Sequence, residues 1–125
     1  MTYKIDDLRD HPEFARIVAE RVWAAWWRRH GHPLEHLISL VDLNLNPASS
    51  IPFALVAHRN GRFLGTVSVI ASDMEARPNL SPWVAALWVD SEYRREGVGS
   101  SLTRKATETA FALGYSPVYL CAAPS

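Results

Sequence analysis

The chain alternates between stretches of nearly continuous apolar residues and stretches in which apolar residues recur every three or four positions. The strongest local signal is a pair of apolar segments, 53–59 and 62–71, that flank Asn60-Gly61. This dipeptide suits a type I′ turn, because both central residues of that turn need positive φ. The pattern predicts two antiparallel strands joined by a tight turn.

Three other segments carry the spacing of an amphipathic helix. The first begins near Pro12 and ends near Gly31, and the second covers 34–41. The third runs over about 98–113, with Gly114 placed as its stop signal. The sequence therefore predicts three helices, two before the hairpin and one after it.

Short apolar segments predict the remaining strands, at 3–5, 83–89 and 118–122. A polar segment with two prolines, 72–82, connects the hairpin to the strand at 83–89. The expected order is strand, two helices, hairpin, strand, helix and strand. Because helices and strands are interspersed without the regular strand–helix alternation of a parallel sheet, this order indicates the α+β class.

Composition limits the classes of function. The 125 residues predict a single domain over 1–125, and thirteen basic residues balance thirteen acidic ones at a pI near 7.0. A neutral chain lacks the field that holds nucleic acid or an anionic membrane, so neither is an expected partner. The single Cys121 cannot form an internal disulfide, and the first residues do not resemble a signal peptide. These features predict a soluble, cytoplasmic protein.

The segment RREGVG, residues 94–99, lies between a predicted strand and a predicted helix. A helix start offers unpaired N–H groups and a positive dipole end, and glycines let a phosphate approach the backbone. The pattern suits a pyrophosphate, with charge-assisted contacts from Arg94 and Arg95 and a hydroxyl from Ser100 or Ser101.

The same G-x-G also suits a tight turn without a ligand. It is not a Walker loop, because the lysine after the second glycine and the four-residue spacer are absent. It is not the dinucleotide-binding fingerprint either, because the third glycine is missing and an antiparallel hairpin precedes it.

The order of elements and the segment WVDSEYRREGVGSSL resemble the GNAT superfamily of acetyl-coenzyme A dependent N-acetyltransferases, most closely over 83–113. The resemblance implies a mostly antiparallel central sheet flanked by helices, with acetyl-CoA as co-substrate. It also implies that the Leu87 N–H donates to the thioester carbonyl. The implied cofactor-binding residues are Leu87, Val89, Arg94, Arg95, Gly97, Val98, Gly99 and Ser100.

The implied reaction is direct attack on the thioester by a primary amine of a small molecule or a peptide. The amine must lose a proton to a carboxylate or a histidine. Many family members carry a glutamate on the strand before the motif, but residues 84–88 of this chain contain no acid. The nearest substitutes are Asp73 and Glu75, and Asp73 is the predicted base. The alternative is that both are solvated loop charges.

Other residues have two interpretations. Trp23, Trp26 and Trp27 either wall an aromatic substrate pocket or pack in the core. The histidines at 30, 32 and 36 have no consistent ligand spacing with Cys121, so no metal site is expected.

The resemblance also implies a helix and two strands that would follow Ser125, so the chain is expected to be C-terminally short. The apolar last strand at 118–122 would then be an edge, which predicts either a homodimer through that edge or coverage of the edge by a further segment. Because the family's general-acid tyrosine has no counterpart, a non-catalytic coenzyme A binding or interaction domain remains the alternative function.

Overall fold

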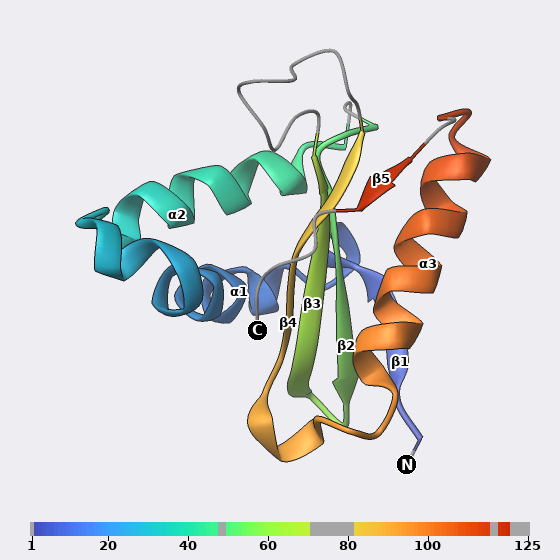
Figure 1. Cartoon of the computed structure of the whole chain (residues 1–125), viewed down its shortest axis with the longest axis horizontal. Helices are drawn as coiled ribbons and strands as arrows, with labels where there is room; N and C mark the ends of the chain where they lie inside the picture. Colours follow the sequence, from blue (N-terminus) through green and yellow to red (C-terminus); the bar gives the residue numbers. More distant parts are fainter. Residues whose placement is uncertain (1, 48–49, 71–81, 116–117, 121–125) are drawn as a thin grey trace.

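A computed structural model of the chain describes residues 2–47, 50–70, 82–115 and 118–120. These residues form a five-stranded sheet whose first four strands are antiparallel and whose fifth is parallel to the fourth (Figure 1). The strands, in both sequence and spatial order, are β1 (Lys4–Asp7), β2 (Phe53–Arg59), β3 (Arg62–Ile70), β4 (Trp83–Val89) and β5 (Tyr119–Leu120).

Helices cover both faces of this sheet (Figure 1). α1 (Ala15–Val22) and α2 (Leu34–Asp42) lie on one face, and α3 (Val98–Ala112) lies on the other. Val18 of α1 and Leu102 of α3 are almost fully buried, in two separate apolar clusters. The expected α+β fold, a mostly antiparallel sheet flanked by helices, is confirmed.

The hairpin predicted from local turn chemistry is confirmed. Asn60 has φ 52° and Gly61 has φ 77°, as a type I′ turn requires. β2 matches its predicted bounds, and β3 ends at Ile70. Both strands bury residues of both faces, because helices cover the sheet on each side.

The first predicted helix has the predicted extent, but it is not a regular α-helix along its whole length. A 3-10 turn at Pro12–Phe14 precedes α1, and a π-helical turn at Trp23–Trp27 and a 3-10 turn at Arg28–His30 follow it. Gly31, with φ 80°, ends the helical path. The apolar spacing that predicted this helix reports which residues face the core, and it does not distinguish these helical types.

Two strand predictions need correction or lie partly outside the described residues. The first strand is Lys4–Asp7 and not 3–5, because Asp6 and Asp7 pair with Val56 and Leu55 of β2. Tertiary pairing overrides the low strand propensity of aspartate. Of the predicted strand at 118–122, only Tyr119–Leu120 is described as β5, so self-association through its edge stays a prediction.

Candidate active site

β4 and β5 pair over only two residues. Trp83 pairs with Tyr119 and Val84 with Leu120. Beyond Val84, no strand in the described part of the chain pairs with β4 on the edge opposite β3. In Figure 1, β5 runs from the α3 side of the molecule toward β4. Main-chain groups in the second half of β4 are therefore available for a ligand that lies along the strand.

A β-bulge bends β4 at the same place. Ala86 has φ 54°, and the paired positions advance by three residues in β4 (Ala85 to Trp88) against two in β3 (Ser68 to Thr66). The extra residue re-aims the side chains that follow it, as bulges near functional sites do. The side chain of Leu87, directly after Ala86, is 39% exposed.

Gly65 of β3 lies against this bulge. A Cβ at Gly65 would lie 2.7 Å from the carbonyl oxygen of Trp88, which belongs to the backbone and cannot turn aside. Glycine lets the two strands approach closely. This pairing fixes the path of β4 beyond Ala86.

The N-terminus of α3 faces the open edge of β4. Gly97 caps the helix with φ 81°, and the Ser101 N–H donates to the Gly97 carbonyl at 3.0 Å. No side chain caps this end. The N–H groups of Val98, Gly99 and Ser100 therefore remain for a ligand, and the helix dipole favours an anionic one.

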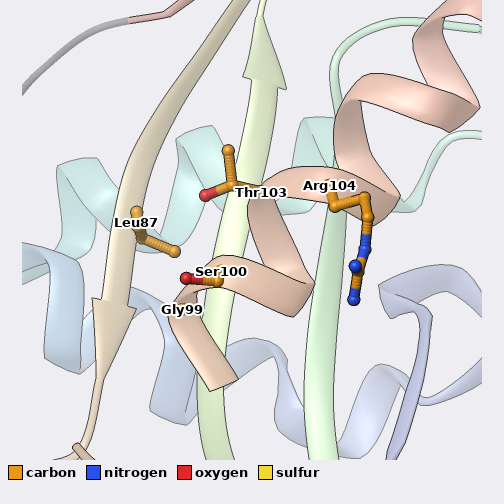
Figure 2. A pocket seen from close by; sticks show the side chains of 5 residues that line it. All are labelled: Leu87, Gly99, Ser100, Thr103 and Arg104. Carbon is orange, nitrogen blue, oxygen red and sulfur yellow. The ribbon is translucent and has the colours of Figure 1, made fainter. Parts of the chain in front are cut away.

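Two grooves meet at this helix start and share Gly99 and Ser100. One, of about 270 Å³, lies beside the RREGVG loop, and the other, of about 590 Å³, lies between β4 and α3 (Figure 2). Leu87 and Ser100 point toward one another across the larger groove. The smaller is lined by Val89, Tyr93, Arg94, Arg95, Gly97, Val98, Gly99 and Ser100, and the larger by Leu87, Gly99, Ser100, Thr103 and Arg104.

All eight residues named from the sequence as cofactor-binding thus line one continuous site. Thr103 and Arg104 extend it and were not predicted. Both lie one helical turn after Gly99 and Ser100, so the three-to-four spacing on α3 is the signal that would have found them.

Arg94 and Arg95 have different surroundings. The Nε of Arg94 donates to the Val89 carbonyl at 2.8 Å, and its guanidinium lies over the Trp88 ring, 4.7 Å from the centroid. The carbonyl of Val89, a residue predicted to bind the cofactor, is therefore already bonded within the chain. Arg95 is exposed, with φ 68°. Arg94 is held at the end of β4, whereas Arg95 is available to an anion.

Tyr93 anchors the loop from beneath. Its ring is 93% buried in the cluster under α3, and its hydroxyl accepts a hydrogen bond from Arg62 of β3 at 3.1 Å. Tyr93 therefore attaches the loop to the core and to β3, beside the groove.

Within the part of the chain that the structure describes, no candidate proton acceptor lines the larger groove. None of the residues that line the larger groove is an acid or a histidine. Asp90 lies nearby in sequence, but its carboxylate accepts hydrogen bonds from Trp88 at 2.8 Å and Arg21 at 2.9 Å. The predicted base, Asp73, and its neighbour Glu75 lie outside the described residues.

The tryptophans pack against other side chains. Trp26 meets Trp88 edge-on, with ring centroids 6.3 Å apart, and Trp27 contacts His32 at 4.9 Å. Trp23 donates a hydrogen bond to the His32 carbonyl at 2.6 Å. None of these tryptophans lines either groove. The structure favours the packing interpretation over a substrate wall.

The groove fits a ligand that carries a pyrophosphate at one end and an extended arm at the other. Among the described residues, unpaired N–H groups and Arg95 are at the first end, and an edge of β4 without a strand partner is at the second. Within the described residues, no helix is long and apolar enough to cross a bilayer.

Comparisons with known proteins define the class. Residues 9–125 match the model of the acetyltransferase (GNAT) family. The chain therefore belongs to the GNAT acetyltransferase family, and acetyl-CoA is the co-substrate of that family. A search of curated proteins finds no match.

Solved structures agree on the fold. Aminoglycoside N-acetyltransferase AAC(6')-Iy in complex with CoA is similar, with TM-score 0.74 and 17% identity over 98% of this chain and 78% of that one. The complex of AAC(6')-Iy with a CoA-S-monomethyl-acetylneamine bisubstrate analogue has TM-score 0.75 and 17% identity, over 100% of this chain and 82% of that one. Glucosamine-6-phosphate N-acetyltransferase from Arabidopsis thaliana has TM-score 0.64 and 17% identity, over 98% of this chain and 84% of that one.

Proposed function

We propose that this protein transfers an acetyl group from acetyl-CoA to a primary amine of a small molecule or a peptide. The observation that carries the proposal is the continuous groove that joins the α3 N-terminus to the unpaired edge of β4. Solved neighbours of the same fold include enzymes named for acetylating aminoglycosides and glucosamine 6-phosphate, which are amino-bearing small molecules.

Each part of the co-substrate has a proposed binding region. The N–H groups of Val98, Gly99 and Ser100, with Arg95, bind the pyrophosphate. The pantetheine arm follows the second half of β4 as an added strand would. The backbone N–H of Leu87 serves the thioester carbonyl.

The co-substrate supplies an activated acetyl thioester, and the chain supplies position and charge. The amine attacks the thioester carbon directly, and the Leu87 N–H donates to the oxygen on which negative charge develops. The C–S bond then breaks, and CoA leaves as its thiolate. A positioned donor of this kind contributes about 2.7–4 kcal/mol in other acyl-transfer enzymes. Asp73 accepts the proton of the incoming ammonium, either directly or through water.

Two measurements test the proposal. Calorimetry with CoA tests binding, and release of free CoA thiol from acetyl-CoA in the presence of a panel of amines tests transfer. We expect saturable binding and amine-dependent thiol release, with Asp73→Asn losing transfer while it keeps CoA binding. Glu75→Gln is the matched control and should keep both.

The outcomes separate the alternatives. CoA binding without transfer to any amine supports the non-catalytic CoA-binding domain and contradicts the enzyme. Absence of CoA binding at about 1 mM contradicts both.

A further inference from the structure

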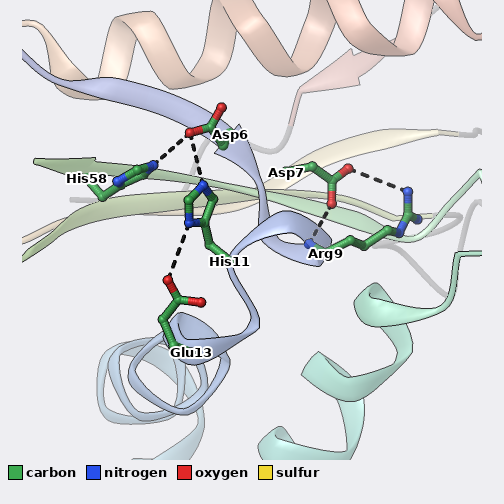
Figure 3. Close-up of polar contacts among 6 residues, drawn as sticks. All are labelled: Asp6, Asp7, Arg9, His11, Glu13 and His58. Atoms are coloured by element: carbon green, nitrogen blue, oxygen red, sulfur yellow. Dashed lines mark hydrogen bonds and ion pairs between the residues drawn. The ribbon is translucent and has the colours of Figure 1, made fainter. Parts of the chain in front are cut away.

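A cluster of two imidazoles and a carboxylate lies at the β1 edge of the sheet, away from the acetyl-CoA groove (Figure 3). Asp6 belongs to β1, His58 belongs to β2, and His11 lies between the turns Leu8–Asp10 and Pro12–Phe14. β3 lies between β4 and the two strands that carry Asp6 and His58. Its chemistry is therefore independent of the acyl-transfer site.

The ligand atoms of these residues converge. His58 Nε2 lies 2.8 Å from Asp6 Oδ2, and His11 Nε2 lies 3.3 Å from the same oxygen. One ligand atom from each residue lies within 4.8 Å of the others. Ligands of a tetrahedral Zn²⁺ at about 2.0–2.1 Å lie about 3.3 Å from one another. The separation of His11 Nε2 from Asp6 Oδ2 already has this value.

The ring of His11 faces a carboxylate on each side. Its Nδ1 lies 3.3 Å from Glu13 Oε2, and its Nε2 faces Asp6 (Figure 3). A neutral imidazole has one N–H, so it can donate to only one of the two. With Nδ1 donating to Glu13, the Nε2 lone pair faces the Asp6 carboxylate, and either a second proton or a metal cation between them removes the repulsion. A carboxylate on the far nitrogen of a histidine is also the usual outer partner of a metal ligand.

The remaining contacts orient the ligands. His58 is buried and follows a register shift at Ala57/His58, and its ring lies 5.5 Å from Phe14 and 4.4 Å from His11. The Asp6 carboxylate thus accepts from His58 on one side and faces His11 on the other. Asp7, next along the chain, is turned to the Arg9 N–H at 2.8 Å and is not part of the cluster.

We propose that Asp6, His11 and His58 bind a divalent transition-metal ion of the Zn²⁺ type, with water in the fourth position. Two imidazole nitrogens and one carboxylate oxygen suit Zn²⁺, Co²⁺ and Ni²⁺. Asp6 and His11 are 37% and 30% exposed, so the fourth position opens to solvent. The bound ion ties β1 to β2 and to the turn that precedes α1.

The sequence did not suggest this site, and no metal was expected from it. Asp6 and His11 are five positions apart, and His58 is 47 positions further on, which matches no ligand motif. Only the antiparallel pairing of β1 with β2 brings the three together. Lys4, which pairs with His58 in the register, is exposed.

The test is Zn²⁺ binding to the full 125-residue chain after removal of any affinity tag. We expect one Zn²⁺ per chain in calorimetry and a melting temperature that rises with Zn²⁺ concentration and falls again with chelator. Asp6→Asn and His11→Gln should abolish saturable binding, and Glu13→Gln should weaken it about 10- to 100-fold. Both ligands to be replaced are half-exposed, so a cooperative melt without metal should show that these variants fold.

The double variant His32→Gln/His36→Gln is the matched control, because those rings stack 5.7 Å apart and form an alternative surface pair. It should bind Zn²⁺ as the parent does. Loss of binding in this control, or unchanged binding in folded Asp6→Asn and His11→Gln, assigns the ion elsewhere and overturns the proposal. Absence of binding at about 1 mM Zn²⁺ overturns it too, and leaves a protonated hydrogen-bond network.

Discussion

The guanidinium of Arg94 lies over the indole of Trp88, 4.7 Å from the ring centroid, while its Nε donates to the Val89 carbonyl. The first arginine of the RREGVG loop is therefore attached to the end of β4, the strand that bounds the proposed acetyl-CoA groove. This contact couples the position of the phosphate-binding loop to the path of the strand.

The two arginines should differ when each is replaced by glutamine. Arg95→Gln should weaken CoA binding by about one to two decades, because one charge-assisted phosphate contact is worth roughly 1.5–3 kcal/mol. Its melting temperature should not change, since Arg95 is exposed. Arg94→Gln should also lower stability, by about 1 kcal/mol, because it loses the Trp88 and Val89 contacts.

Calorimetry with CoA and thermal unfolding of both variants check this difference. Arg104→Gln compares an arginine of the larger groove, outside the RREGVG loop, with the two arginines of the loop. An Arg95→Gln variant with parental CoA affinity contradicts the assignment of this residue.

Gly97 and Gly114 offer a matched pair of substitutions that tests the proposed pyrophosphate site at the start of α3. Both have positive φ, 81° and 97°, and a Cβ at either would meet no atom within 4 Å. Each Ala substitution should cost roughly 1–2 kcal/mol of stability through backbone strain alone. Only Gly97→Ala should weaken CoA binding, because its Cβ enters the space proposed for the pyrophosphate. Equal CoA affinities in the two variants would argue against that placement.

Gly99 tests whether the groove itself binds the ligand. A Cβ there would make ordinary contacts with Val89, at 3.6 Å, and Leu87, at 3.8 Å. Gly99→Ala should therefore be as stable as the parent or more stable than it, by up to about 1 kcal/mol. Gly99→Val should also fold, but its methyl groups narrow the groove, and we expect its CoA affinity to fall at least about tenfold. Isothermal calorimetry measures the CoA affinity of both variants. Parental CoA affinity in Gly99→Val would place the ligand elsewhere.

Gly65→Ala should be strongly destabilising. Its Cβ would lie 2.7 Å from the Trp88 carbonyl oxygen, so β3 and β4 would have to separate at the bulge. We expect a loss of about 1–3 kcal/mol, typical of overpacking, seen as a lower midpoint in urea. Ser68→Ala, on the same strand, is the control and should change the midpoint little. An unaltered midpoint in Gly65→Ala is incompatible with the close approach described.

Sequence reasoning succeeded where the signal is local. Asn60-Gly61 specified the hairpin because positive φ at two adjacent residues is a property of those residues. The RREGVG loop does precede the start of α3, as its glycines predicted, whereas the anion site assigned to it stays a prediction.

The features that could not be predicted depend on pairing between distant segments. Ala86 carries no signal for positive φ, and the bulge there exists because β4 must pair with β3 around Gly65. The extension of β1 through Asp6 likewise depends on its register with β2. Register between segments some 50 residues apart is set by packing and not by local propensity.

Titration of the ¹⁵N-labelled chain with CoA, followed by amide chemical shifts, tests the central claim most directly. The account predicts saturable shifts concentrated at Leu87 and at Gly97, Val98, Gly99 and Ser100, with little change in α1 and α2. Saturable shifts confined to the α1–α2 face, or no shifts at millimolar CoA, would contradict it.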